Sequence, residues 1–185
     1  MRKAADRMAG FTITEWSYDE KQLHADLRML AEMLHATIEA GASIGFVQPF
    51  SIADAHTFWR DSVLPELRKG RRRMLLAREG ETIVGTVQLV PAVPANQRHR
   101  ADVIKLMVHP RARRRSIARA LMNAVEQLAR AEGRTLLTLD TRTGDTAEPL
   151  YRSLGYLTVG VIPRYSRAAD SPLLEAATFL YKELA

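Results

Sequence analysis

Residues 101–139 change hydrophobic period twice, and this segment constrains the fold more than any other part of the chain. Residues 101–108 have the apolar pattern of a strand, and residues 136–139 form a short run typical of a buried strand. Between them, apolar residues recur at the 3.6-residue period of a helix, at Ile117, Leu121, Val125 and Leu128. A strand, a helix and a buried strand in this order predict a β-α-β crossover, which requires two parallel strands.

Antiparallel strands are predicted on both sides of this crossover. Residues 74–77 and 83–87 flank a Gly-containing turn and predict a hairpin, and further strands are expected at 11–16, 156–162 and 176–182. Helices are expected from residue 23 to 38, from 52 to 63 and from 147 to 154. The sequence therefore predicts a mixed α/β fold, with a mostly antiparallel twisted sheet of about seven strands, one parallel crossover and four helices.

The chain length and apolar content favour a single domain. With 185 residues, 46% of them apolar, the chain can bury one substantial core. We expect this domain to span residues 11–185, preceded by a mobile N-terminal extension at residues 1–10. No stretch has the ~18 consecutive apolar residues of a membrane span, and no apolar run follows the start. We therefore expect a soluble cytoplasmic protein without membrane association.

Cysteine and histidine usage narrows the chemistry. The chain has no cysteine, which excludes a disulfide scaffold, a thiolate metal site and a cysteine nucleophile. The five histidines do not have the spacing of metal ligands, so no metal site is expected. No arrangement of Ser, His and Asp for nucleophilic catalysis is visible either.

Positive charge is concentrated in one segment. The chain has 27 Lys and Arg against 21 Asp and Glu, and residues 98–119 contain eight basic residues but a single acid, Asp102. Between the predicted strand and helix lies a basic turn, residues 113–119. Unpaired N–H groups and the positive end of a helix dipole meet at such a turn and can hold a pyrophosphate. The alternatives are a solvated charged turn and a nucleic-acid footprint; we expect no nucleic acid, because the arginines crowd one turn instead of lining a face.

The basic turn resembles the acetyl-CoA-binding turn of the GNAT superfamily of N-acetyltransferases, which has the pattern R/Q-x-x-G-x-G/A. The matching residues are Arg113-Arg114-Arg115-Ser116-Ile117-Ala118, with Ser116 in place of the first glycine. A Cβ at this position is expected to narrow the approach of phosphate oxygens to the backbone. Residues 106–110, 119–122 and 148–156 also resemble the family pattern, and the resemblance extends from about residue 11 to residue 183.

The resemblance implies that acetyl-CoA is the co-substrate. The strand would bond the pantetheine arm through its main chain, and an N–H near Met107 or Val108 would polarise the thioester carbonyl. The basic turn would hold the pyrophosphate. The cofactor-binding residues implied in this way are Leu106, Met107, Val108, Arg113, Arg114, Arg115, Ser116, Ile117, Ala118 and Arg119.

Three residues resemble catalytic positions of the family. Tyr151 matches the general acid that protonates the leaving thiolate; the alternative is a tyrosine of the core. Asp102 and Asp140 lie on the two strands of the crossover, Asp140 at the end of its strand, where they can converge on an ammonium group. The alternatives are a helix or turn cap at Asp140 and an ion pair of Asp102 with Lys105 or Arg100.

Within the superfamily, the sequence is most similar to the tabtoxin-resistance acetyltransferase group, at residues 41–46, 100–108 and 139–141. In that group, acids at the positions of Asp102 and Asp140 bind the acceptor and take its proton. This resemblance implies direct transfer of an acetyl group to the primary amine of a small amino-acid-like molecule or antimetabolite. Two alternatives remain: an acyl-CoA-binding domain with weak or no turnover, because Ser116 breaks the turn motif, and acetylation of a protein or peptide amine. A homodimer also remains open.

Overall fold

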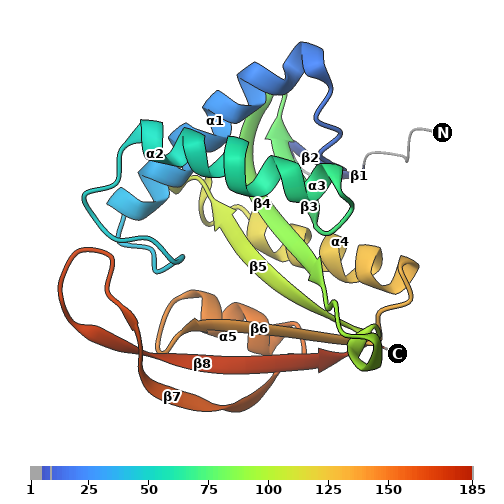
Figure 1. Cartoon of the computed structure of the whole chain (residues 1–185), viewed down its shortest axis with the longest axis vertical. Helices are drawn as coiled ribbons and strands as arrows, with labels where there is room; N and C mark the ends of the chain where they lie inside the picture. The colour runs from blue at the N-terminus through green and yellow to red at the C-terminus, as the bar shows by residue number, and fades with distance from the viewer. Residues whose placement is uncertain (1–5, 9, 185) are drawn as a thin grey trace.

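The computed structural model describes residues 6–8 and 10–184, and one twisted sheet of eight strands runs through this part of the chain (Figure 1). The strands lie in the order β1-β2-β3-β4-β5-β6-β8-β7. All neighbouring pairs are antiparallel except β5 and β6, which are parallel. The strands are β1 (Asp6–Met8), β2 (Phe11–Glu15), β3 (Arg73–Glu79), β4 (Thr82–Pro91), β5 (Arg100–Val108), β6 (Leu136–Arg142), β7 (Leu157–Arg167) and β8 (Leu174–Glu183).

The helices follow the predicted order and confirm the mixed α/β fold with one parallel crossover. The second expected helix is a continuous segment of three parts, α2, η1 and α3, in which η1 is a π-helix. Helix α4 makes the crossover between β5 and β6. The helices are α1 (Glu20–Glu39), α2 (Ile52–Thr57), η1 (Phe58–Val63), α3 (Leu64–Arg68), α4 (Ile117–Ala131) and α5 (Ala147–Ser153), with short 3₁₀ turns η2 (Ala95–Gln97) and η3 (Pro110–Ala112).

Helices cover both faces of the sheet. Ile117, Leu121 and Val125 of α4 are fully buried in a cluster with apolar residues of β4 and β5. On the opposite face, α1 and the α2–α3 segment enclose a second cluster around Trp59, whose indole N–H donates to the Leu30 carbonyl at 3.0 Å. Figure 1 shows α4 and the α2–α3 segment on opposite sides of β4 and β5. The middle strands of the sheet are therefore buried on both faces.

The π-helical turn allows the second helix to pass Pro65. Proline has no N–H, and inside an α-helix its ring clashes with the carbonyl four residues earlier, here that of Asp61. In η1 the chain is wound more widely, so that the Leu64 N–H donates to the Trp59 carbonyl, five residues back. The helix therefore continues to Arg68.

Two predicted boundaries differ from the structure: the start of the domain and the end of β6. Asp6–Met8, within the segment expected to precede the domain, forms β1 and pairs with β2, whereas residues 1–5 and 9 lie outside the described residues. Strand β6 extends to Arg142 because residues 140–142 pair with residues 177–179 of β8. Asp140 therefore lies inside a strand, and its side chain shares a face of the sheet with Thr138, since alternate residues of a strand share a face.

Candidate active site

Strands β5 and β6 separate after a short stretch of pairing. They pair from Arg100↔Leu136 to Asp102↔Thr138, whereas β5 continues to Val108 and β6 to Arg142. We call the part of the two strands beyond this last pair the splay. Within the described residues, no strand pairs with the β6-facing edge of β5 in the splay. Main-chain groups on that edge are available to a ligand.

The side chains at the end of β5 are directed into the protein interior. Met107 is buried in the cluster beneath α1, and Leu106 and Val108 are partly buried against the α4 cluster. These three residues can therefore serve a cofactor through their main-chain groups, as the sequence resemblance implied. Their side chains hold the strand in place.

The basic turn presents a run of unpaired N–H groups. Arg114 and Ser116 both have positive φ, 64° and 60°. Among the described residues, no N–H from residue 114 to residue 119 donates to a main-chain carbonyl; the first bond of α4 runs from the Ala120 N–H to the Ser116 carbonyl at 3.0 Å. Successive N–H groups in a turn of this kind can point to one side and form an anion-binding concavity. The helix dipole of α4 adds positive potential at the same place.

Ser116 has the backbone conformation of a glycine. Its φ of 60° and ψ of 8° lie in the left-handed region, where an L-residue with a Cβ is strained. Its side chain forms no capping hydrogen bond with α4 and is exposed. The family pattern has glycine here for this backbone geometry, and the serine preserves the geometry.

The arginines of the basic turn divide into two groups. Arg113 and Arg114 are exposed and form no ion pair with a carboxylate of the described residues. Arg115 pairs with Glu79 at 2.6 Å, and Arg119 donates to the Ser153 hydroxyl at 2.8 Å. Arg113 and Arg114 are therefore the side chains free to meet phosphate oxygens, while Arg115 and Arg119 tie the turn to neighbouring elements. Ile117 and Ala118 can contribute their N–H groups.

Gly85 on β4 fixes the position of this turn. A Cβ on Gly85 would lie 3.0 Å from Leu121 Cδ1, 3.0 Å from the Met107 carbonyl oxygen and 3.1 Å from Ile117 Cγ2. The absent side chain allows the first turn of α4 to pack closely on β4 and β5. The N–H groups of the basic turn are thereby held beside the splay.

Tyr151 lies on α5, on the same face of the sheet as α4. Its side chain is buried, and its ring contacts Tyr156 edge-on, with the centroids 6.0 Å apart. Burial raises the pKa of the Tyr151 hydroxyl far above its usual value, and the negative charges of Asp145 and Asp140 raise it further. The hydroxyl therefore stays protonated at neutral pH.

Asp102 and Asp140 lie on the neighbouring strands β5 and β6. The Asp102 carboxylate accepts hydrogen bonds from Arg100, at 2.6 Å, and from the Thr138 hydroxyl. The sequence had left Lys105 and Arg100 open as ion-pair partners of Asp102, and in the structure the partner is Arg100. Asp140 is exposed in the splay, yet partial burial raises the pKa of its carboxyl group; the Lys105 ammonium opposes this shift, and the Asp102 charge adds to it.

Sequence reasoning did not identify Lys105 as a site residue. It lies in a β-bulge with φ of 52°, where the β4–β5 register shifts between Thr86 and Gln88. Its ammonium donates to the Ile44 carbonyl at 2.6 Å and lies 5.0 Å from the centroid of the Phe46 ring. A lysine inside an otherwise apolar strand segment was the available signal. The backbone conformation that turns this side chain toward residues 44–46 comes only from the pairing of β4 with β5.

The sequence of the chain matches a known protein family. A model of the acetyltransferase (GNAT) family matches residues 33–156. The chain belongs to this family. An uncharacterized N-acetyltransferase encoded in the hisH–hisA intergenic region of Azospirillum brasilense is 33% identical over 127 residues, which are 67% of this chain and 73% of that protein.

Solved structures of GNAT type share the fold. The ribosomal-protein-alanine N-acetyltransferase of Brucella melitensis has a TM-score of 0.74 at 21% identity, over 93% of this chain and 99% of that chain. The protein yncA of Salmonella typhimurium, solved with its cofactor acetyl-CoA, has a TM-score of 0.74 at 16% identity, over 96% of this chain and 95% of that chain. Its membership of the GNAT family identifies the chain as an acyltransferase that uses acetyl-CoA. No helix of the described residues is long and apolar enough to cross a membrane.

Proposed function

We propose that the protein transfers the acetyl group of acetyl-CoA to the primary amine of a small amino-acid-like molecule by direct attack. The observation that carries this proposal is the position of the splay. The α4–α5 face of the sheet holds the basic turn and Tyr151, and the opposite face holds Asp102 and Asp140. A donor on the first face and an acceptor on the second would meet between β5 and β6.

The residues present fit acetyl-CoA. The N–H groups of residues 114–119, with the side chains of Arg113 and Arg114, would hold the pyrophosphate. The free edge of β5 at residues 106–108 would bond the pantetheine arm. Acetyl-CoA supplies an acetyl group activated as a thioester. A main-chain N–H near Met107 or Val108 would polarise its carbonyl group, which makes the carbon more electrophilic.

Asp140 and Tyr151 would handle the protons of this reaction. The ammonium group of the acceptor gives a proton to Asp140, directly or through water, and its nitrogen then forms a bond to the acetyl carbon. As the carbon–sulfur bond breaks, the Tyr151 hydroxyl gives its proton to the sulfur, and the second proton lost by the nitrogen returns to the Tyr151 oxygen through water. The raised pKa of Asp140 makes it a stronger base than an ordinary carboxylate, and burial keeps Tyr151 protonated until the thiolate forms.

Asp102 would act through its charge. Its carboxylate accepts hydrogen bonds from Arg100 and Thr138, which orient it. Together with Asp140 it makes the acceptor side of the splay favourable for an ammonium group. The resemblance of residues 41–46, 100–108 and 139–141 to the tabtoxin-resistance acetyltransferase group supports an acceptor of amino-acid size.

A screen for thiol release tests the proposal. The protein is incubated with acetyl-CoA and amino acids, polyamines, aminoglycosides or peptides with free N-termini, and free thiol is measured. Amino acids or their close analogues should give the highest kcat/KM. Preference for peptides would favour the acetylation of a protein or peptide amine, the reaction type in the name of the Brucella structure. Acetyl-CoA binding by isothermal titration, without thiol release for any class, would favour a binding domain.

A further inference from the structure

Arg72 and Lys105 are two partly buried cations on the acceptor side of the sheet without a carboxylate partner. Neither forms an ion pair within the described residues, although the chain forms such pairs at many other places. The Lys105 ammonium donates to the Ile44 carbonyl and lies over the rings of Phe46 and Phe58. A cation removed from water without a counter-ion is costly, so this arrangement favours an anion from outside the chain.

The two cations also repel each other. Burial lowers the pKa of Lys105, and the positive charge of Arg72 lowers it further, while Asp140 opposes the shift. Burial likewise lowers the pKa of Arg72, while the negative charge of Glu66, which forms no ion pair with Arg72, opposes the shift. A negatively charged group between Arg72 and Lys105 would relieve this repulsion. The acid whose charge acts on Lys105, Asp140, is the group assigned to the acceptor's amine.

Gln88 adds a buried donor to this site. It is fully buried, and its Oε1 accepts a hydrogen bond from Arg72 Nη1 at 2.9 Å, which fixes the orientation of the amide. Gln88 Nε2 and Arg72 Nε are then buried without a hydrogen-bond partner among the described residues. Gln88 pairs across the sheet with Ile104, next to Lys105. Two unused donors, Gln88 Nε2 and Arg72 Nε, thus accompany two cations that form no ion pair within the described residues, which is the chemistry of a carboxylate-binding site.

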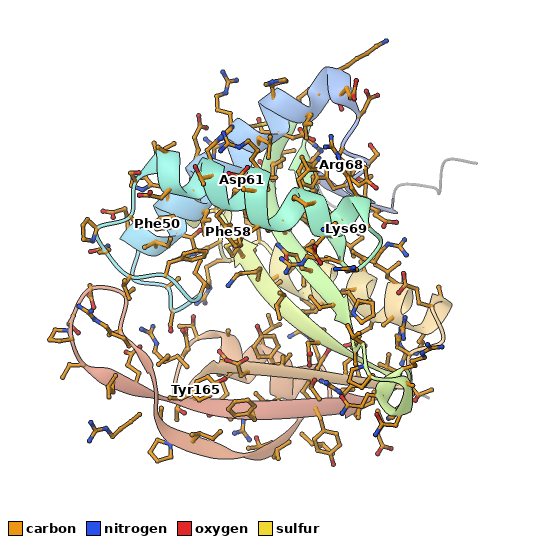
Figure 2. The ribbon with its side chains drawn as sticks, in the orientation of Figure 1. Phe50, Phe58, Asp61, Arg68, Lys69 and Tyr165 are labelled. Carbon is orange, nitrogen blue, oxygen red and sulfur yellow. The ribbon has the colours of Figure 1, made fainter. Side chains whose placement is uncertain are left out.

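An aromatic group lies beside these donors. Phe46 contacts Phe50 and Phe58, with ring centroids 4.7 and 4.9 Å apart. Figure 2 shows Phe50 beside the α2 end of the α2–α3 segment, Phe58 further along it, and Lys69 toward its other end. These rings offer apolar contact to the carbon chain of a ligand, while the residues 44–46 that carry Phe46 are bound to Lys105 through Ile44.

We propose that Arg72, Gln88 and Lys105 form a subsite for a carboxylate of the acceptor, which would then be a zwitterion with its ammonium group at Asp140. This inference rests on the proposed acetyl transfer and goes beyond it, because it selects free amino acids over polyamines, aminoglycosides and internal peptide amines. The negative charge of Asp140 would hold the ammonium end of the acceptor, and the positive charges of Arg72 and Lys105 would hold its carboxylate end.

Matched pairs of amines test the subsite. Thiol release from acetyl-CoA is measured with α-, β- and γ-amino acids and with the carboxamide of each, which keeps the amine and removes the negative charge. The same compounds are added to the protein without acetyl-CoA, and thermal unfolding is followed. At least one acid should exceed its amide about tenfold or more in kcat/KM, as expected for a charge-assisted hydrogen bond, and should raise Tm where the amide does not.

Variants separate the subsite from a general effect of charge. Lys105→Met and Arg72→Met, each checked by circular dichroism and thermal unfolding, should bring the acid-to-amide ratio close to one. Lys69→Met is the control for Lys105, because Lys69 is 55% exposed and pairs with Glu66 on the surface. Arg71→Met is the control for Arg72, since Arg71 is 65% exposed. Both controls should keep the ratio of the unmodified protein. If one of the two subsite variants does not fold, the acid-to-amide ratio of the other variant still tests the subsite.

The outcomes distinguish the two proposals. Amides acetylated as well as acids, or a ratio unchanged in Lys105→Met and Arg72→Met, would overturn the subsite and leave the acetyl transfer standing. Acids that raise Tm through Lys105 and Arg72 but release no thiol would support the subsite and contradict the proposed function. If neither acids nor amides bind or react, the carboxylate subsite is wrong.

Discussion

Replacing Ser116 with glycine tests the conformation of the basic turn directly. Ser116 holds φ at 60° and ψ at 8°, a left-handed conformation that costs an L-residue about 1–2 kcal/mol. Its exposed side chain forms no capping bond with α4, so the substitution removes no hydrogen bond from the helix. Glycine also gives the unfolded chain more conformational freedom, which offsets about 0.4–1 kcal/mol of the strain relieved in the folded state. The net expectation is a stabilisation of about 0.5–1 kcal/mol.

The measurement is thermal unfolding, with urea unfolding as a check. For a domain of this size, about 0.5–1 kcal/mol corresponds to a rise in Tm of about 1–4 °C. Ser116→Ala is the matched control, because it removes the hydroxyl but keeps the Cβ and therefore the strain. This control should show no gain in stability. A Ser116→Gly protein with unchanged or lower Tm would refute the reasoning that Ser116 is strained.

Acetyl-CoA affinity of the same two variants reports on the phosphate site. If the Cβ crowds the pyrophosphate, Ser116→Gly should bind acetyl-CoA as tightly as the original protein or more tightly, and Ser116→Ala should bind equally. Isothermal titration gives both values. A marked loss of affinity in both variants would show that the hydroxyl donates to a phosphate, which would contradict the expected crowding.

Four further predictions concern cofactor binding, proton transfer and packing. Arg113→Glu with Arg114→Glu should weaken acetyl-CoA binding in isothermal titration with little change in Tm, because both side chains are exposed and unpaired within the described residues; unchanged affinity would place the pyrophosphate elsewhere. Tyr151→Phe should lower kcat about 10²-fold and leave acetyl-CoA affinity nearly intact, since only the proton donor is lost; full activity would return Tyr151 to a structural role. Asp140→Asn should lower kcat/KM for the amine, with partial recovery at higher pH as the amine loses its proton to solvent. Because burial raises the pKa of Asp140, the unmodified protein should lose activity on acidification at a pH above that expected for an ordinary aspartate, and this limb should be missing from the Asn variant in pH–rate profiles. Gly85→Ala should cost about 1–3 kcal/mol in urea unfolding and weaken acetyl-CoA binding, because the added Cβ pushes on the Met107 carbonyl and on α4; an unchanged free energy of unfolding would show that α4 does not depend on this contact.

The sequence by itself determined the order of the helices and strands and the position of the basic turn between a strand and a helix. The change of hydrophobic period across residues 101–139 defines a strand, a helix and a strand, because it records which side of each element is buried. The same reasoning placed Tyr151 on a helix and Asp102 on a strand, as observed. Periodicity is a local property, so these features could be predicted without knowledge of the fold.

Tertiary structure decided the features on which the chemistry depends. The register of β5 with β4 places the bulge at Lys105. The register of β6 with β8 decides how far β6 extends past Asp140, and the two strands of the crossover stop pairing after Asp102 and Thr138. The periodic pattern of one strand contains no information about its partner's register. The contact of Arg72 with Gln88 joins residues 16 apart on neighbouring strands, and the lack of a counter-ion at Lys105 follows from everything packed around it. Whether a buried charge is balanced depends on all its neighbours in space, and only the folded chain assembles them.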